Sequence, residues 1–231
     1  MKFFQSKRPH EYFLDVIVII IGILISLYFS NMSTRRENKN EEKRILENLK
    51  NNLAADTVRI NEALDYFKGG VYTTTQVLKR DFIFLDNADS LSVYFGNMVV
   101  YVTMPLQRIT FIEISQNGGA AFITNKSLLD SINLHYTQYY TFVEEYYEID
   151  KHHILERMVP FMEDNFDLYG SRELYDPAKK EYLKTFFSRT DFRNYLTTNL
   201  IFKSNTMTLH NLYKDHAKML INAIDEELKK N

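Results

Sequence analysis

Cysteine is absent from the 231-residue chain, which excludes disulfides, thiolate nucleophiles, iron–sulfur clusters and thiolate zinc sites. The absence leaves the compartment open, because cytosolic and extracytoplasmic proteins can both lack cysteine. Glycine and proline are scarce, at 7 and 4 residues, which argues against a turn-rich sandwich, barrel or collagen-like fold and predicts long uninterrupted elements. The net charge of −2 gives no sign of a nucleic-acid partner, and acidic residues interrupt the basic runs.

One long apolar run stands out in a chain whose mean hydropathy of −0.32 is otherwise typical of a soluble protein. It extends from Val16 to Phe29 without a charge, and with its flanks it covers residues 13–32. About 20 residues suffice to cross a hydrocarbon core, so we predict a transmembrane helix. The alternatives are a buried core helix and a cleaved signal peptide, which the flanks fit poorly because no small-residue cleavage site follows.

The charges beside this segment leave its orientation open. Three cations lie in the N-terminal tail, residues 1–12, and five follow the segment between residues 35 and 44. A bare count favours a cytoplasmic C-terminal side, but long domains cross membranes largely regardless of charge. We expect the N-terminal tail inside and the large domain outside, with the span in the inner membrane.

Small residues form a stripe along the predicted membrane helix. Gly22, Ser26 and Ser30 follow one another at steps of four, which lets a second helix approach closely. Asp15 lies almost on the same stripe, either as an interfacial helix cap or as a buried partner contact or proton-responsive group. We predict that these four residues form a membrane-helix packing surface.

Apolar residues recur at helical spacing through the rest of the chain. Residues 33–68 continue the membrane segment as a juxtamembrane helix, with a first stop expected at Gly69–Gly70. Residues 69–231 then form a helical bundle domain, in which Pro160 is expected to kink or end a long helix. The fold class is all-α, an N-terminal transmembrane helix followed by an elongated antiparallel helical bundle. Shorter features are expected as a helix at 71–85, a turn at 87–90, irregular or short helical structure at 91–103, a helix at 105–116, a long helix capped by Thr124 or Asn125, a loop at 167–177, a helix at 178–187, and a last helix capped by Thr190 and Asp191.

The densest polar cluster lies between residues 144 and 153. Glu145, Glu148 and His152 share a helical face, and Asp150 and His153 have the spacing seen in carboxylate-bridged metal bundles. Such sites need a second Glu-x-x-His motif, and the two histidines of the last helix lack an acidic residue three positions earlier. A solvated charged face is the preferred interpretation, and we expect no metal and no other cofactor.

Tyrosines crowd the same helix, at Tyr136, Tyr139, Tyr140 and Tyr147. Tyrosine at helical spacing is commonly core with its hydroxyl satisfied at the rim, and a ligand-binding surface is the alternative. The sequence contains no nucleophile elbow, phosphate-binding loop, dinucleotide fingerprint or zinc-protease motif. We therefore predict no catalytic residue and lean against an enzyme.

The N-terminal third carries a resemblance. An acidic residue opens a V-I-G-I-L-I-A-L-type helix, matched by Asp15 and Gly22, before an exit similar to W-N-E-x-R, where Met32 replaces the aromatic residue. Residues 119–128 are similar to a G-x-L-x-x-I-x-N-x-x-L segment of the same family. The chain thus resembles an uncharacterised bacterial family of single-pass membrane-anchored helical proteins, the domain of unknown function 6090. The resemblance implies an anchor and a helical domain, and it implies no activity.

These features predict an envelope interaction protein, scaffold or accessory subunit without catalysis. Its partners would be the lipid bilayer and either a second copy of the chain or another membrane protein. The main alternative is a ligand-sensing bundle ectodomain that signals through a membrane partner. A metal-binding bundle enzyme and a proton-coupled Asp15 in a motor-type complex rank below it.

Overall fold

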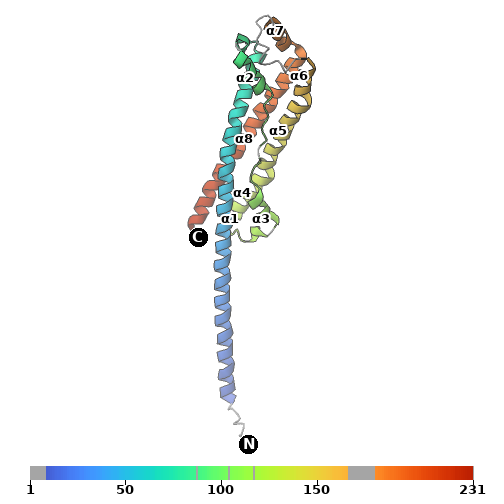
Figure 1. Ribbon diagram of the computed structural model, residues 1–231. Coiled ribbons are helices and arrows are strands. Elements are labelled where there is room, and N and C mark those ends of the chain that lie inside the picture. The colour runs from blue at the N-terminus through green and yellow to red at the C-terminus, as the bar shows by residue number, and fades with distance from the viewer. Residues whose placement is uncertain (1–8, 87, 104, 117, 166–179, 231) are drawn as a thin grey trace.

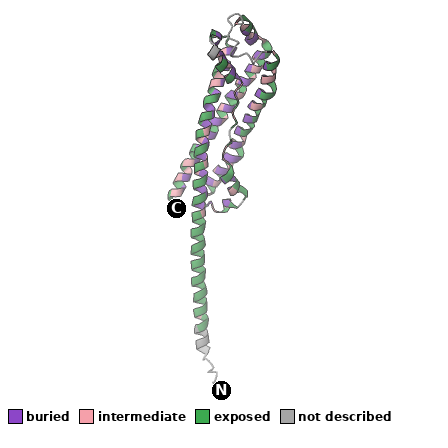
Figure 2. Ribbon diagram, viewed as in Figure 1, coloured by how far each residue is buried: buried purple, intermediate pink, exposed green. Residues whose placement is uncertain are grey.

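The computed structural model describes residues 9–86, 88–103, 105–116, 118–165 and 180–230. All regular elements in these ranges are helical, which confirms the predicted all-α class. Figure 1 shows an elongated bundle from which half of one long helix projects toward the N-terminus. Figure 2 shows that buried residues follow the bundle and that the projecting half is exposed.

The projecting helix is α1 (Pro9–Leu78), which has 70 residues. Every residue from 18 to 40 is exposed, and the first buried one is Glu42. The exposed part contains an 18-residue window of mean hydropathy 2.2, none of it buried, so α1 is long and apolar enough there to cross a membrane. From residue 45 onward the same helix supplies one wall of the bundle core.

The stop expected at Gly69–Gly70 is wrong, because α1 continues to Leu78. A Cβ on Gly70 would lie 3.0 Å from the carbonyl oxygen of Asn97 and 3.0 Å from Cδ of Lys203. Glycine therefore permits close packing in mid-helix here. The helix ends where Arg80 takes a left-handed conformation, with a φ of 62°, in the hydrogen-bond pattern of a Schellman motif.

The segment after α1 differs from expectation in two places. Helix α2 (Ala88–Met98) occupies most of the predicted turn at 87–90, after a 3-10 turn at Ile83–Asp86. Helix α3 (Ile109–Gln116) begins four residues later than the helix predicted from Pro105. Between them residues 99–103 and 105–108, which we call the strap, have no regular structure.

A second long helical run follows a 3-10 turn at Gly119–Ala121. It comprises α4 (Lys126–Leu134), α5 (Tyr140–His153) and α6 (Val159–Asn165), joined by π-helical turns at His135–Tyr139 and Ile154–Met158. Of the two predicted caps it is Asn125 that caps the run, since its Oδ1 accepts from the Leu128 N–H at 3.1 Å.

Pro160 does not end this run, contrary to one of the two expected outcomes. Helix α6 contains the proline and continues to Asn165. Proline lacks an N–H and crowds the carbonyl one turn earlier. The π-helical turn at Ile154–Met158 lies at this place and widens the backbone, which accommodates the ring.

Helices α7 (Lys180–Ser188) and α8 (Thr190–Lys230) complete the described chain close to the predicted positions. The loop predicted at 167–177 lies outside the described residues. Helix α8 has 41 residues and packs along both α1 and α5. The core divides into a cluster around Leu49, Phe67 and Tyr213 and an aromatic cluster around Phe84 and Phe187 at the far end.

Candidate functional site

The inward face of α8 carries buried polar side chains on successive turns, which we call the polar seam. Its members are Asn199, Lys203, Thr206, His210 and Tyr213. Apolar periodicity alone does not identify Lys203 and His210, because both are polar residues on the buried face of α8. Because buried polar groups require partners, each of these two identifies a specific contact across the bundle.

The central contact of the seam is an ion pair between Lys203 and Asp150 of α5. The Lys203 Nζ donates to both Asp150 oxygens at 3.1 Å and to the carbonyl oxygen of Val100 in the strap at 2.6 Å. Burial lowers the pKa of Lys203 and raises the pKa of Asp150, and their mutual attraction opposes both shifts. Removing one partner would leave the other charged and buried.

The next contact joins His210 to Tyr147 of α5. The His210 Nδ1 lies 2.6 Å from the carbonyl oxygen of Thr206, so this nitrogen carries the proton and donates. The Nε2 therefore accepts from the Tyr147 hydroxyl at 2.6 Å. Burial lowers the pKa of His210 to about 4, which keeps the ring neutral near pH 7.

A third contact fixes the strap to α1 through Asp56. Its two oxygens accept from the Gln107 N–H at 3.0 Å, and one also accepts from the Tyr213 hydroxyl at 2.9 Å. Arg59 donates to the carbonyl oxygen of Pro105 at 3.0 Å. Burial raises the pKa of Asp56 to about 6, and the bonds from Gln107 and Tyr213 limit the rise. Side chains thus satisfy backbone groups that regular structure would otherwise satisfy.

Two histidines face each other beside the seam. The Nδ1 atoms of His135 and His216 lie 3.1 Å apart, and Tyr139 stacks on His216 with ring centroids 4.5 Å apart. Burial lowers the pKa of His135 to about 3. The His135 Nε2 and the Tyr136 hydroxyl are buried and make no hydrogen bond within the described chain.

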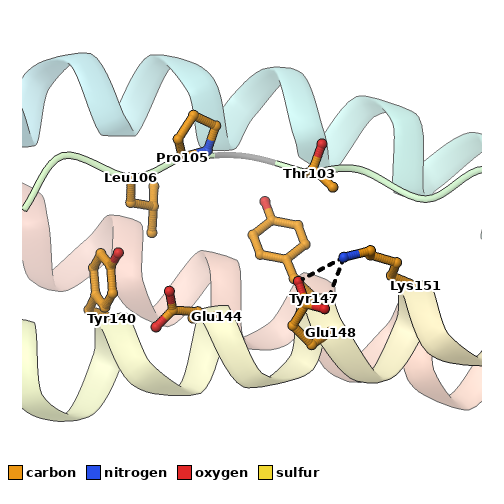
Figure 3. A pocket seen from close by; sticks show the side chains of 8 residues that line it. All are labelled: Thr103, Pro105, Leu106, Tyr140, Glu144, Tyr147, Glu148 and Lys151. Carbon is orange, nitrogen blue, oxygen red and sulfur yellow. Dashed lines mark hydrogen bonds and ion pairs between the residues drawn. The ribbon is translucent and has the colours of Figure 1, made fainter.

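The strap and α5 enclose a cleft of about 350 Å³ beside the polar seam. Figure 3 shows its lining residues, Thr103, Pro105, Leu106, Tyr140, Glu144, Tyr147, Glu148 and Lys151. The Lys151 ammonium lies 3.0 Å from Glu148, and the Arg108 guanidinium lies 5.0 Å from the centroid of the Tyr140 ring. The cleft therefore combines aromatic surface with charges of both signs.

The structure separates the four tyrosines that the sequence grouped. Tyr140 and Tyr147 line the cleft, Tyr136 is fully buried, and Tyr139 is half-buried against His216. A ligand surface made of all four is therefore not present in the described structure, and only two of them share a cavity.

The residues weighed as metal ligands lie on the exposed side of α5, where two of them contact neighbours on the same run of helix. His152 pairs with Glu156 at 2.8 Å, Glu148 pairs with Lys151, and Glu145 is exposed. Asp150 and His153, whose spacing suggested a metal bundle, instead bind Lys203 and the carbonyl oxygen of Tyr195. Within the described residues no group of three or more histidine, aspartate or glutamate side chains could hold a metal ion.

The predicted membrane-packing surface lies on the projecting half of α1. Asp15, Gly22, Ser26 and Ser30 are all exposed there. A Cβ on Gly22 would meet no atom within 4 Å. The surface is thus accessible, and its role in packing stays a prediction.

Comparison with known protein families gives a match. The model of the Family of unknown function (DUF6090) covers residues 15–156, which run from the exposed apolar half of α1 through α5. No curated protein and no solved structure matches the chain. The matched range includes Asp56, Tyr147 and Asp150, and it ends before their α8 partners. Since the match covers more than half of the sequence, the chain belongs to this family of unknown function.

Proposed function

We propose that this protein is a single-pass membrane protein whose helical bundle binds or scaffolds other envelope proteins without catalysis of its own. The observation that carries the proposal is α1, one helix that is apolar and exposed at one end and core-forming at the other. A helix that is apolar on all sides requires either a protein core or lipid around it. None of the described helices covers this part of α1, so lipid is the fitting environment.

The proposed contact with a membrane partner is the stripe of Gly22, Ser26 and Ser30, with Asp15 at its edge. Without a Cβ at Gly22 and with short serine side chains, a second helix can approach closely. The partner is either a second copy of this chain or another membrane protein.

Native purification followed by mass spectrometry of co-eluting proteins tests the proposal. We expect the double variant Gly22→Leu/Ser26→Leu to lose its membrane partner or its self-association. The control is Ile20→Ala/Leu24→Ala, which changes side-chain size on the opposite face of the helix. Equal assembly of both variants and the wild type, in detergent and in lipid, would overturn the proposal.

We further propose that the span lies in the inner membrane with the bundle outside the cytoplasm. The absence of cysteine makes this directly testable, because a single introduced thiol is the only site for a maleimide. Ser204 is exposed on α8, so Ser204→Cys suits this use. We expect a membrane-impermeant maleimide to label intact spheroplasts, whereas labelling only after lysis would place the bundle inside.

The cleft supports a second candidate, a ligand-sensing bundle that signals through a membrane partner. Its volume of about 350 Å³ and its aromatic and charged lining suit a small polar molecule. Leu106→Trp would fill the cleft from the strap side. A small molecule retained by the wild type in native mass spectrometry and lost from this variant would favour sensing, and identical ligand-free masses would argue against it.

A further inference from the structure

We infer that the first turns of α1 beyond the membrane segment bind the headgroups of anionic phospholipids. The surface is a basic face formed by Arg35, Arg36 and Lys39, all exposed. The inference rests on the proposed function, since it requires residues 13–32 to cross a bilayer. It adds a lipid class to the proposed membrane association.

Helix geometry brings the three cations to one side of α1. At about 100° per residue, Arg35, Arg36 and Lys39 fall within an arc of about 100°. Tyr28 lies on the same face two turns nearer the membrane centre, and a shallow hollow of about 180 Å³ is lined by Tyr28, Asn31, Met32 and Arg35. Tyrosine at this level is typical of the interface between membrane and water.

The neighbouring acids do not pair with this face. Glu37 accepts from the Ser33 hydroxyl at 3.1 Å, and Glu41 pairs with Arg44 at 2.6 Å. Glu42 is buried and accepts from the Thr124 N–H at 2.7 Å.

The three cations of the basic face are therefore unpaired. Within the described residues no side-chain hydrogen bond or ion pair involves Arg35, Arg36 or Lys39. They are available to an external anion.

The direction of the side chains selects lipid as that anion. Cα–Cβ bonds in a helix tilt toward its N-terminus, and in α1 that direction points back to the membrane segment. At 1.5 Å per residue, the Arg35 and Lys39 backbones lie about 5 and 10 Å beyond Met32. Their long side chains thus reach the level of the headgroups, within about one Debye length.

A single reporter can test the inference, because the chain contains no tryptophan. Tyr28→Trp places an indole on the basic face at the membrane interface. The full-length chain would be reconstituted in vesicles of phosphatidylcholine and phosphatidylglycerol, with bromine carried by one lipid or the other at equal mole fraction. Bromine quenches the indole at short range, so the ratio of the two quenching efficiencies reports which lipid lies beside Tyr28→Trp.

We expect brominated phosphatidylglycerol to quench more strongly, and the preference to fall as salt is raised. Each cation near the surface should favour the anionic lipid over the neutral lipid by about fivefold, the factor equivalent to about 1 kcal/mol. Arg35→Gln/Arg36→Gln/Lys39→Gln in the reporter background should therefore reduce the preference at least fivefold. The matched control removes three cations from the bundle, Lys68→Gln/Lys79→Gln/Lys184→Gln. This control should keep the preference for phosphatidylglycerol.

Equal quenching by the two lipids, or a preference unchanged in the basic-face variant, would overturn the inference and leave the membrane anchor intact. Absence of quenching by either lipid would instead show that the span is outside the bilayer, which contradicts the proposed function as well. A variant that keeps the lipid preference but loses a co-purifying acidic protein would assign the basic face to that protein and refute lipid binding.

Discussion

The two halves of α1 share one backbone and differ in what surrounds them. From residue 18 to residue 40 every side chain is exposed, whereas Leu49, Leu53 and Phe67 in the second half are completely buried. The first half is apolar on all sides between Val16 and Phe29, and the second is apolar along one stripe only. The helix thus continues through both surroundings. A helix that is apolar on all sides suits lipid, whereas a helix with one apolar stripe suits packing against other helices.

The largest expected effect comes from a charge placed in each half. Leu49→Asp buries an unpaired carboxylate in the core and should destabilise the bundle by more than about 4 kcal/mol, which unfolds it. Leu24→Asp should cost about 2.5–3.5 kcal/mol of membrane insertion and leave the bundle folded. Thermal unfolding followed by circular dichroism, together with membrane fractionation, separates the outcomes. Unfolding of the bundle by Leu24→Asp would contradict the conclusion that only the second half of α1 belongs to the bundle core.

The buried ion pair between Lys203 and Asp150 is a second test of the difference between the two halves of α1. Lys203 lies over the ring of Phe67, which belongs to the second half. Lys203→Met leaves the Asp150 charge unpaired and should cost about 3–5 kcal/mol of bundle stability. Adding Asp150→Leu should recover most of the loss, since an apolar pair has no charge to desolvate. Urea denaturation of both variants tests this, with membrane retention expected unchanged. A double variant as unstable as the single one would show that the charges themselves stabilise the fold.

Acid should weaken the bundle half of α1 and spare the exposed apolar half. The pKa values of His135 and His210 are lowered to about 3 and about 4, so below the unfolded value of about 6.5 the unfolded chain binds more protons. Each should therefore reduce the free energy of unfolding by about 2 kcal/mol between pH 7 and pH 5.

Asp56 acts in the opposite direction over the same range. Its raised pKa of about 6 makes the folded chain bind the extra proton, so it returns about 1 kcal/mol between pH 7 and pH 5. Denaturation curves at pH 7 and pH 5 should show a net loss of unfolding free energy at the lower pH, and His210→Gln should make this loss smaller. If the stability of the wild type did not change with pH, the conclusion that His135 and His210 are buried in the neutral form would be wrong.

The smallest expected effect comes from a methyl group added to each half. Gly70→Ala meets the Asn97 carbonyl oxygen and the Lys203 side chain at 3.0 Å and should cost about 1–3 kcal/mol. Gly22→Ala meets nothing within 4 Å and should leave the bundle melting temperature unchanged. Paired thermal melts give the measurement, and equal melting temperatures for the two variants would show that the packing at Gly70 is looser than described.

The sequence predicted helices, the apolar segment and the cap at Asn125 because spacing, length and capping are local signals. It did not predict the partners of the polar seam, since Asp56 and Tyr213 are 157 residues apart. A buried lysine such as Lys203 interrupts an apolar stripe in the sequence and is identified only by the carboxylate opposite it. The helix ends predicted at Gly70 and Pro160 were wrong for a related reason. Whether a glycine or a proline ends a helix depends on the structure around it.

The unbroken course of α1 has a mechanical consequence. Between Asp15 and Leu78 it forms a lever about 95 Å long. It contains no proline, and its one glycine pair lies close to α2 near the far end. Torque applied to the exposed apolar part of α1 would therefore be delivered to the packing surface around Leu49 and Phe67, because no hinge absorbs it. Rotation of the lever by one residue position, about 100°, would turn that whole surface away from α8.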